Sequence, residues 1–242
     1  MPTRRSLKTC TRRSRTVGVI VTLADLRFAA RMSAPPDLFE LRLDRLTKHL
    51  AEVEDAVKKL RAPIIITARH PLEGGTNKLN ARQRAALLLR FLDHTDYVDI
   101  ELRALCELRS VYRQARAKKI GLIVSFHDLK HTPSLPRLRA KARAAVTAGA
   151  DIFKVAVRTD NHTQLQRLLD FFDEQHVDLA MSAMGMGKLG RKSRRELMRR
   201  GSVLNYARLG RPSFPGQPSL RAIQRWTLSA CHAVALRRRV ER

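Results

Sequence analysis

Eight short apolar runs alternate with helix-like patterns along this chain of 242 residues, and this alternation restricts the fold more than any other feature. Eight strand–helix units in about 250 residues are typical of a (β/α)8 barrel. We therefore expect an α/β protein with a single (β/α)8 TIM barrel; a doubly wound open sheet is the alternative. The predicted strands cover Val17–Thr22, Leu38–Leu43, Pro63–Arg69, Tyr97–Leu102, Gly121–His127, Asp151–Val157, Asp178–Ala183 and Ser202–Arg208. The predicted helices cover Leu23–Met32, Lys48–Leu60, Ala81–Asp93, Leu105–Ala117, Pro136–Ala148, His162–Glu174, Arg191–Arg199 and Ser219–Leu236.

No break in composition divides the chain, so we expect one catalytic domain over residues 16–236. Residues 1–15 contain six Lys or Arg and no acid, and they lack the apolar run of a secretory signal. This segment is predicted to be a disordered basic arm, with a transit peptide as the alternative. Residues 237–242 are predicted to form a frayed basic tail.

The chain carries 48 Lys and Arg against 22 Asp and Glu, a formal net charge of +26. The positive charge occurs on nearly every predicted helix and at both ends, and one Trp and three Tyr offer few rings for base stacking. We therefore expect a solvated basic surface that favours an anionic small substrate, and no specific nucleic acid. A nucleic-acid-binding protein is the alternative class.

The longest apolar runs have the length of strands, so we expect no membrane span and no membrane partner. Three cysteines, Cys10, Cys106 and Cys231, are far apart and lack the spacing of metal ligands. We expect reduced thiols in a cytoplasmic protein with no bound metal.

Ionisable and apolar residues alternate along several predicted strands. In the second, Phe39 and Leu41 share one face while Glu40 and Arg42 share the other. Helices cover the outside of a barrel strand, so the apolar face is predicted to point outward and the ionisable face toward the barrel axis. Buried charges are costly unless paired, which predicts an ion network around a site. Its predicted members are Glu40, Arg42, Asp44, Arg69, Asp99, Glu101, His127 and Lys154.

Lys154 stands inside the apolar strand Ile152–Val157. A lysine kept out of water, with arginines nearby, would favour the neutral amine, which forms an imine with a ketone. His127, on the preceding predicted strand, is a natural proton carrier for such chemistry. A lysine that extends to the surface, and a histidine that is simply packed in the core, are the structural alternatives.

Seven motifs, in order, resemble the type I 3-dehydroquinase family over roughly residues 16 to 220, and this resemblance implies a (β/α)8 barrel. The family's reaction is the dehydration of 3-dehydroquinate to 3-dehydroshikimate, in the shikimate pathway, through a lysine imine. The motifs are Glu40–Asp44, Thr67–Arg69 with Glu73–Gly75, Val98–Glu101, Ser125–Asp128 with Thr132-Pro133, Phe153–Val155, Met186–Arg194 and Ser213–Gln217.

The resemblance also implies the role of each site residue. Lys154 would form the imine at the C3 ketone, His127 would act as general acid and base, and Glu73 would orient and charge His127. His127 is thus expected to have a near-neutral pKa. The residues implied in substrate binding are Arg194 for the carboxylate, Glu40 and Arg69 for the ring hydroxyls, Arg42 to pair with the neighbouring acids and shape the site, and Ser213 and Gln217 in a closing loop.

The resemblance implies no cofactor, since the lysine itself activates the substrate, and 3-dehydroquinate is the expected partner. The family commonly forms homodimers, so we expect a homodimer here. Another lysine-imine barrel, such as an aldolase or transaldolase, is the first alternative function. An inactive barrel that serves as a scaffold is another.

Overall fold

The computed structural model describes residues 14–174, 177–210 and 216–227. The predicted tail lies outside the described residues, as do the predicted arm up to residue 13, Cys10, Cys231 and Ser213. Arg15, the last residue assigned to the arm, is the first residue of a strand.

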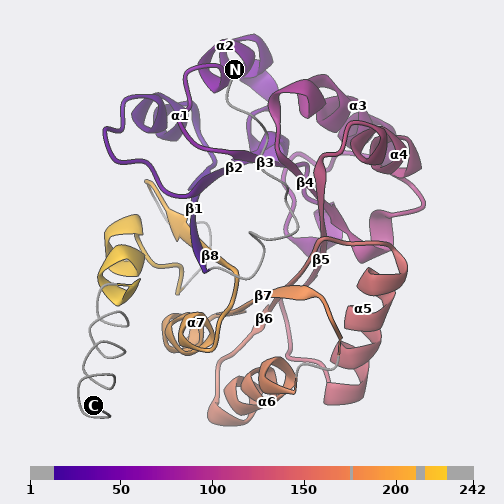
Figure 1. Cartoon of the computed structure of the whole chain (residues 1–242), viewed down its shortest axis with the longest axis vertical. Helices are drawn as coiled ribbons and strands as arrows, with labels where there is room; N and C mark the ends of the chain where they lie inside the picture. Colours follow the sequence, from indigo (N-terminus) through magenta and orange to yellow (C-terminus); the bar gives the residue numbers. More distant parts are fainter. Residues whose placement is uncertain (1–13, 175–176, 211–215, 228–242) are drawn as a thin grey trace, which may run out of the picture.

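The strands are β1 (Arg15–Ile20), β2 (Leu38–Arg42), β3 (Ile64–Thr67), β4 (Tyr97–Glu101), β5 (Gly121–Asp128), β6 (Ile152–Arg158), β7 (Ala180–Met186) and β8 (Leu204–Arg208). They form one parallel ring, and the helices lie outside it (Figure 1). The ladder order is β7-β6-β5-β4-β3-β2-β1-β8, so the first strand pairs with both the second and the last. Between β7 and β8, the Val203 N–H donates to the Met181 carbonyl at 3.0 Å. The predicted (β/α)8 barrel is confirmed, and the open sheet is wrong.

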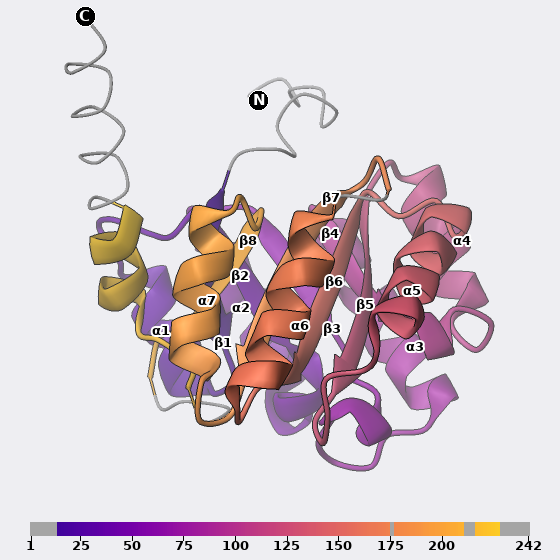
Figure 2. The same ribbon diagram turned by 90° about the horizontal axis from the view of Figure 1, so that it is seen from below.

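The helices surround the strands as an outer layer (Figure 2). They are α1 (Leu23–Ala30), α2 (Leu50–Val57), α3 (Ala81–Phe91), α4 (Arg109–Ala117), α5 (Leu135–Thr147), α6 (His162–Asp173) and α7 (Gly190–Arg199). Short 3-10 turns are η2 (Leu43–Arg45), η3 (Thr47–His49), η4 (Pro71–Glu73), η5 (Leu92–His94) and η6 (Leu102–Ala104). Residues 220–227 are also helical, and the rest of the predicted last helix lies outside the described residues.

Local signals explain where several helices begin. Thr22 caps α1 through a reciprocal pair of hydrogen bonds with Asp25, and Asn80 caps α3 in the same way with Gln83. The predicted start of α4 at Leu105 is four residues too early, because the chain first makes the turn η6 and enters the helix at Arg109. The other helix and strand bounds that the structure describes lie within three residues of the predictions.

Two apolar clusters fill the two sides of the sheet. The outer cluster joins strand residues such as Leu41, Ile66 and Val124 to the surrounding helices, as the alternation predicted. The inner cluster fills the barrel at the beginning of the strands; its members Leu38, Ile65, Tyr97, Ile123 and Ile152 are called the apolar layer below. Branched and aromatic side chains at this height close the barrel, so it is not a pore.

Two residues further along each of these strands, the inward side chain is polar. This polar layer consists of Glu40, Thr67, Asp99, Ser125 and Lys154, all buried. The site described below therefore rests on a packed apolar floor.

The last described helix covers the outside of β8, between α1 and α7 (Figure 1). Its residues Leu220 and Ile223 pack with Ala207, and Met32 and Met198 lie against the same cluster. Of the helices that the structure describes, none has the combination of length and apolar character that a membrane span requires.

Candidate active site

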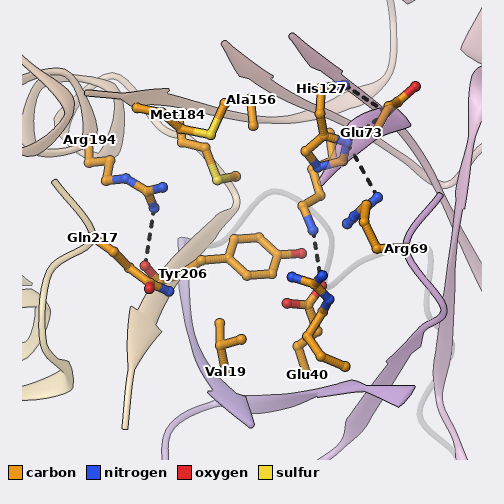
Figure 3. A pocket seen from close by; sticks show the side chains of 13 residues that line it. Val19, Glu40, Arg69, Glu73, His127, Ala156, Met184, Arg194, Tyr206 and Gln217 are labelled. Carbon is orange, nitrogen blue, oxygen red and sulfur yellow. Dashed lines mark hydrogen bonds and ion pairs between the residues drawn. The ribbon is translucent and has the colours of Figure 1, made fainter. Parts of the chain in front are cut away.

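A pocket opens at the carboxyl ends of the strands, directly above the polar layer (Figure 3). It contains about 480 Å³ of space between protein atoms, its open mouth included. Of the nine site residues predicted from the sequence, eight line it: Glu40, Arg42, Arg69, Glu73, His127, Lys154, Arg194 and Gln217. The ninth, Ser213, lies outside the described residues.

Lys154 projects from β6 into the pocket, and only 3% of the residue is exposed. Its Nζ donates to Asp99 Oδ2 at 2.8 Å and to Glu40 Oε1 at 3.1 Å. It also lies 4.0 Å from the centre of the Tyr206 ring. The sequence led us to expect arginines as its charged neighbours, but its ion-pair partners are carboxylates. The alternative of a surface-directed lysine is wrong.

Arg69 is the centre of the predicted ion network. Its guanidinium donates to Asp99 Oδ2 and to Glu101 Oε1, both at 3.0 Å, and to the Ser125 hydroxyl at 3.0 Å. Burial alone would raise the pKa of Asp99, but Arg69 and Lys154 hold it well below its usual range. Asp99 is thus a fixed negative charge between the arginine and the lysine.

Glu101 is held from both sides. Besides Arg69, it accepts from the buried Arg84 of α3 and from the backbone N–H of His70 at 2.8 Å. This pairing of Glu101 with two guanidinium groups and a backbone N–H offsets the cost of burying its charge below the pocket.

Arg42 and Asp44 form a second buried ion pair at the pocket edge. The Arg42 Nε and one terminal nitrogen donate to the two carboxylate oxygens of Asp44, each at 2.9 Å. Burial would raise the pKa of Asp44, but Arg42 and the Thr76 backbone N–H lower it. Glu40, by contrast, accepts from the Thr67 hydroxyl at 2.9 Å and from Lys154. Arg42 therefore shapes the site through Asp44 rather than by pairing with Glu40.

Glu73 reaches His127 from the turn that follows β3. Glu73 Oε2 lies 2.9 Å from His127 Nδ1 and accepts from the His127 backbone N–H at 2.9 Å. The two following glycines permit this turn: Gly74 has φ +92°, and a Cβ on Gly75 would lie 2.1 Å from the Arg69 carbonyl oxygen. The spacing from Arg69 to Glu73 and Gly75 is therefore a geometric requirement of the site.

The pKa of each member of this pair is shifted in the direction that favours its neutral form. Burial, together with Arg69 and Lys154, holds the pKa of His127 well below its ordinary value, so the expected near-neutral pKa is wrong. Burial and the Glu101 charge raise the pKa of Glu73 to about 7. His127 is thus a neutral imidazole in the free protein, and the directions of these shifts do not support the expectation that Glu73 charges it.

Arg194 enters the pocket from α7, opposite Glu73 and Arg69 (Figure 3). Its Nε donates to the Gly185 carbonyl at 3.1 Å and a terminal nitrogen donates to the Tyr206 carbonyl at 3.2 Å. Burial lowers its pKa to about 10, which leaves it charged at neutral pH. Within the described part of the chain no carboxylate acts on its pKa, so this buried cation favours an anionic ligand. Gln217 lies on the same side of the pocket and points toward Arg194 (Figure 3).

Tyr206 and Val19 also line the pocket, and the sequence analysis named neither as a site residue. Both side chains lie on the inward face of their strands, in phase with Leu204 and Val17. Strand alternation applied to β1 and β8 would have found them. Met184 and Met186 complete the apolar wall.

The described residues contain no group of three or more His, Cys, Asp or Glu side chains that could hold a metal ion. Cys106 is an exposed free thiol on the outside of the barrel. The pocket brings together a lysine amine, a neutral imidazole and a guanidinium, which suits imine chemistry with proton transfer on a small anion.

A family model described as type I 3-dehydroquinase matches residues 20–230. The 3-dehydroquinate dehydratase of Methanosarcina barkeri is 35% identical over 203 residues, and the match covers 79% of this chain and 83% of that protein. The 3-dehydroquinate dehydratase of Methanothrix thermoacetophila is 30% identical over 220 residues, and the match covers 87% of this chain and 91% of that protein. The crystal structure of 3-dehydroquinate dehydratase from Geobacillus kaustophilus has a TM-score of 0.79 at 29% identity. The match covers 88% of this chain and 89% of that chain. This chain belongs to the type I 3-dehydroquinase family.

Proposed function

We propose that this chain is a 3-dehydroquinate dehydratase that forms 3-dehydroshikimate, in the shikimate pathway, through an imine on Lys154. The observation that carries the proposal is that one pocket contains Lys154, His127 with Glu73, and an Arg194 without a carboxylate partner in the described chain. The family match supplies the substrate and the reaction.

Arg194 holds the substrate carboxylate at one end of the pocket. A guanidinium binds a carboxylate through two parallel hydrogen bonds, and burial strengthens this contact. Glu40, Arg42 and Arg69 also line the pocket, and Glu40 and Arg69 lie opposite Arg194 (Figure 3). In this proposal Glu40 and Arg69 bind the ring hydroxyls, and the C3 ketone lies near Lys154, between the two ends.

The Lys154 amine attacks the ketone carbon. The lysine ammonium first passes one proton to a neighbouring carboxylate and so becomes the attacking amine. This proton and one more from the nitrogen leave with the ketone oxygen as water, and the iminium keeps the third, so no external acid is consumed. The iminium withdraws electron density from C2, which makes the C2 proton acidic. Asp99 and Glu40, which pair with Lys154 in the free protein, remain beside the positive iminium and stabilise it.

His127 removes the C2 proton. The low pKa of His127 keeps it neutral and ready to accept this proton, and Glu73 fixes its orientation through Nδ1. The proton then passes to the C1 hydroxyl, which leaves as water. Hydrolysis of the iminium releases 3-dehydroshikimate and restores the lysine.

Two measurements test this function together. The conjugated product absorbs in the ultraviolet, so its formation from 3-dehydroquinate can be followed directly. Borohydride reduction during turnover, followed by mass analysis, should place one adduct on Lys154. Folded protein that gives neither product nor adduct would contradict the proposal, and an adduct without product would favour another lysine-imine enzyme such as an aldolase.

We further propose that the chain acts as a homodimer in the cytoplasm. Family resemblance supports the dimer, and the lack of a long apolar run in the sequence supports the location. Light scattering coupled to size-exclusion chromatography tests the dimer: a particle of about 55 kDa, twice the 27.5 kDa chain, is expected. A monomer at micromolar concentration would contradict it.

A further inference from the structure

The hydroxyl of Tyr206 is buried in the pocket and has no hydrogen-bond partner among the residues that the structure describes. Within the described residues, four side chains contain buried polar atoms that lack a partner: Arg15, Arg45, Arg84 and Tyr206. Of these, only Tyr206 lines the pocket. A native protein rarely leaves a buried hydroxyl unpaired, so a polar atom of the pocket's ligand is the natural partner.

The orientation of Tyr206 narrows down which ligand atom this is. The ring lies flat beside Lys154, whose Nζ is 4.0 Å from the ring centre. Its hydroxyl end points away from Arg194 and toward Glu40, which itself binds the lysine (Figure 3). The hydroxyl is therefore on the lysine side of the pocket, not on the side that would hold a carboxylate.

The tyrosine is available as a donor. Burial and the charges of Glu40 and Asp99 raise its pKa well above the ordinary value, so the phenol keeps its proton in the working range of pH. The lysine and its carboxylate partners already satisfy one another. None of the acceptors among the described residues bonds to this hydroxyl, and a ketone oxygen bound beside Lys154 would be such an acceptor.

We propose that Tyr206 is a catalytic residue that donates a hydrogen bond to the oxygen on the carbon attacked by Lys154. This inference rests on the proposed function. As the Nζ–carbon bond forms, the π electrons of the carbonyl move onto this oxygen, which takes protons from the lysine nitrogen and leaves as water. The tyrosine keeps its own proton and stabilises the charge that develops on the oxygen. Its effect is confined to formation and hydrolysis of the imine, because the oxygen is absent during elimination.

The test compares wild-type protein with Tyr206→Phe and with the matched control Tyr112→Phe, which removes a hydroxyl from α4 outside the pocket. Each protein is mixed with 3-dehydroquinate, and borohydride quenches the reaction at successive times. We expect the rate of adduct formation to fall about tenfold in Tyr206→Phe and to stay unchanged in Tyr112→Phe. An unchanged adduct rate, whether or not KM rises, would overturn the inference, because the hydroxyl would then bind another part of the substrate or nothing.

A stability measurement guards against a misfolded variant. Since the hydroxyl has no partner within the described part of the chain, Tyr206→Phe is expected to unfold at the same temperature as wild type or higher. A clearly lower unfolding temperature in Tyr206→Phe would show that the hydroxyl has a structural partner. This result would also overturn the inference. If wild-type protein itself forms no adduct, the proposed function fails instead, so the two failures are distinguishable.

Discussion

The two layers inside the barrel are built on the same strands and differ in almost every physical property. The apolar layer contains branched and aromatic side chains, while the polar layer, two residues further along each strand, contains charges and hydroxyls that bind one another. Lys154, Glu40 and Asp99 belong to the polar layer. The apolar layer excludes water from below, which strengthens every charge interaction above it. The layer that stabilises the barrel and the layer that contains the reactive groups are thus about two residues apart along each strand.

The largest expected effect is the loss of activity in Lys154→Ala, a substitution in the polar layer. Without the amine no imine forms, so kcat/KM should fall by at least about 10⁴-fold, as measured by product absorbance. The exposed Lys59→Ala is the matched control and should keep full activity. Substantial activity in Lys154→Ala with no adduct in the wild type would mean that the polar layer does not work through this amine.

The apolar layer is tested with Ile65→Ala. The truncation leaves a cavity in the barrel floor, and the free energy of unfolding should fall by about 2–5 kcal/mol in urea titrations. Turnover of the folded fraction should change little, because Ile65 does not line the pocket. A variant with wild-type stability would show that the floor is not a tightly packed layer.

Arg194→Lys tests the end of the pocket that lies outside both layers. Lysine keeps the charge but loses the planar fork, and it cannot reproduce both bonds to the Gly185 and Tyr206 carbonyls. We expect KM for 3-dehydroquinate to rise about 10- to 100-fold with a smaller fall in kcat. The equally cationic Arg195→Lys, on the exposed side of α7, serves as the control. An unchanged KM would place the substrate carboxylate elsewhere.

Glu73→Gln should lower kcat/KM by about 10- to 100-fold, since the amide keeps the shape but alters the partner of His127 Nδ1. The pKa of Glu73 is raised to about 7, so the wild-type carboxylate is lost as the pH falls through 7. Wild-type kcat/KM should therefore decline on the acid side of about pH 7, and the variant should lack this decline. The full pH profile of both proteins measures it; identical profiles would assign the decline to another group.

The smallest effect concerns stability. With its raised pKa, Glu73 binds a proton more tightly in the folded than in the unfolded protein between pH 4.5 and about 7. Its contribution to the free energy of unfolding is therefore present at low pH and is lost as the pH rises through this window, by at most about 1.4 kcal/mol per unit. In urea titrations, the free energy of unfolding of the wild type minus that of Glu73→Gln should fall as the pH rises through this window. A rise in this value would contradict the raised pKa.

The sequence by itself determined the barrel and most of the site. Alternation of strands and helices identified the fold, and alternation within strands placed Glu40, Arg69 and Lys154 toward the axis, because these periodicities are local properties of the chain. The resemblance added Glu73 and Arg194, whose loop and helix positions alone would suggest solvent-exposed charges.

Only the tertiary structure decided which groups meet and how each is tuned. That Lys154 binds carboxylates rather than facing arginines depends on packing between β2, β4 and β6. The low pKa of His127 and the unpaired hydroxyl of Tyr206 follow from burial in a closed ring. Burial and charge pairing are sums over residues far apart in the sequence, so no local pattern contains them.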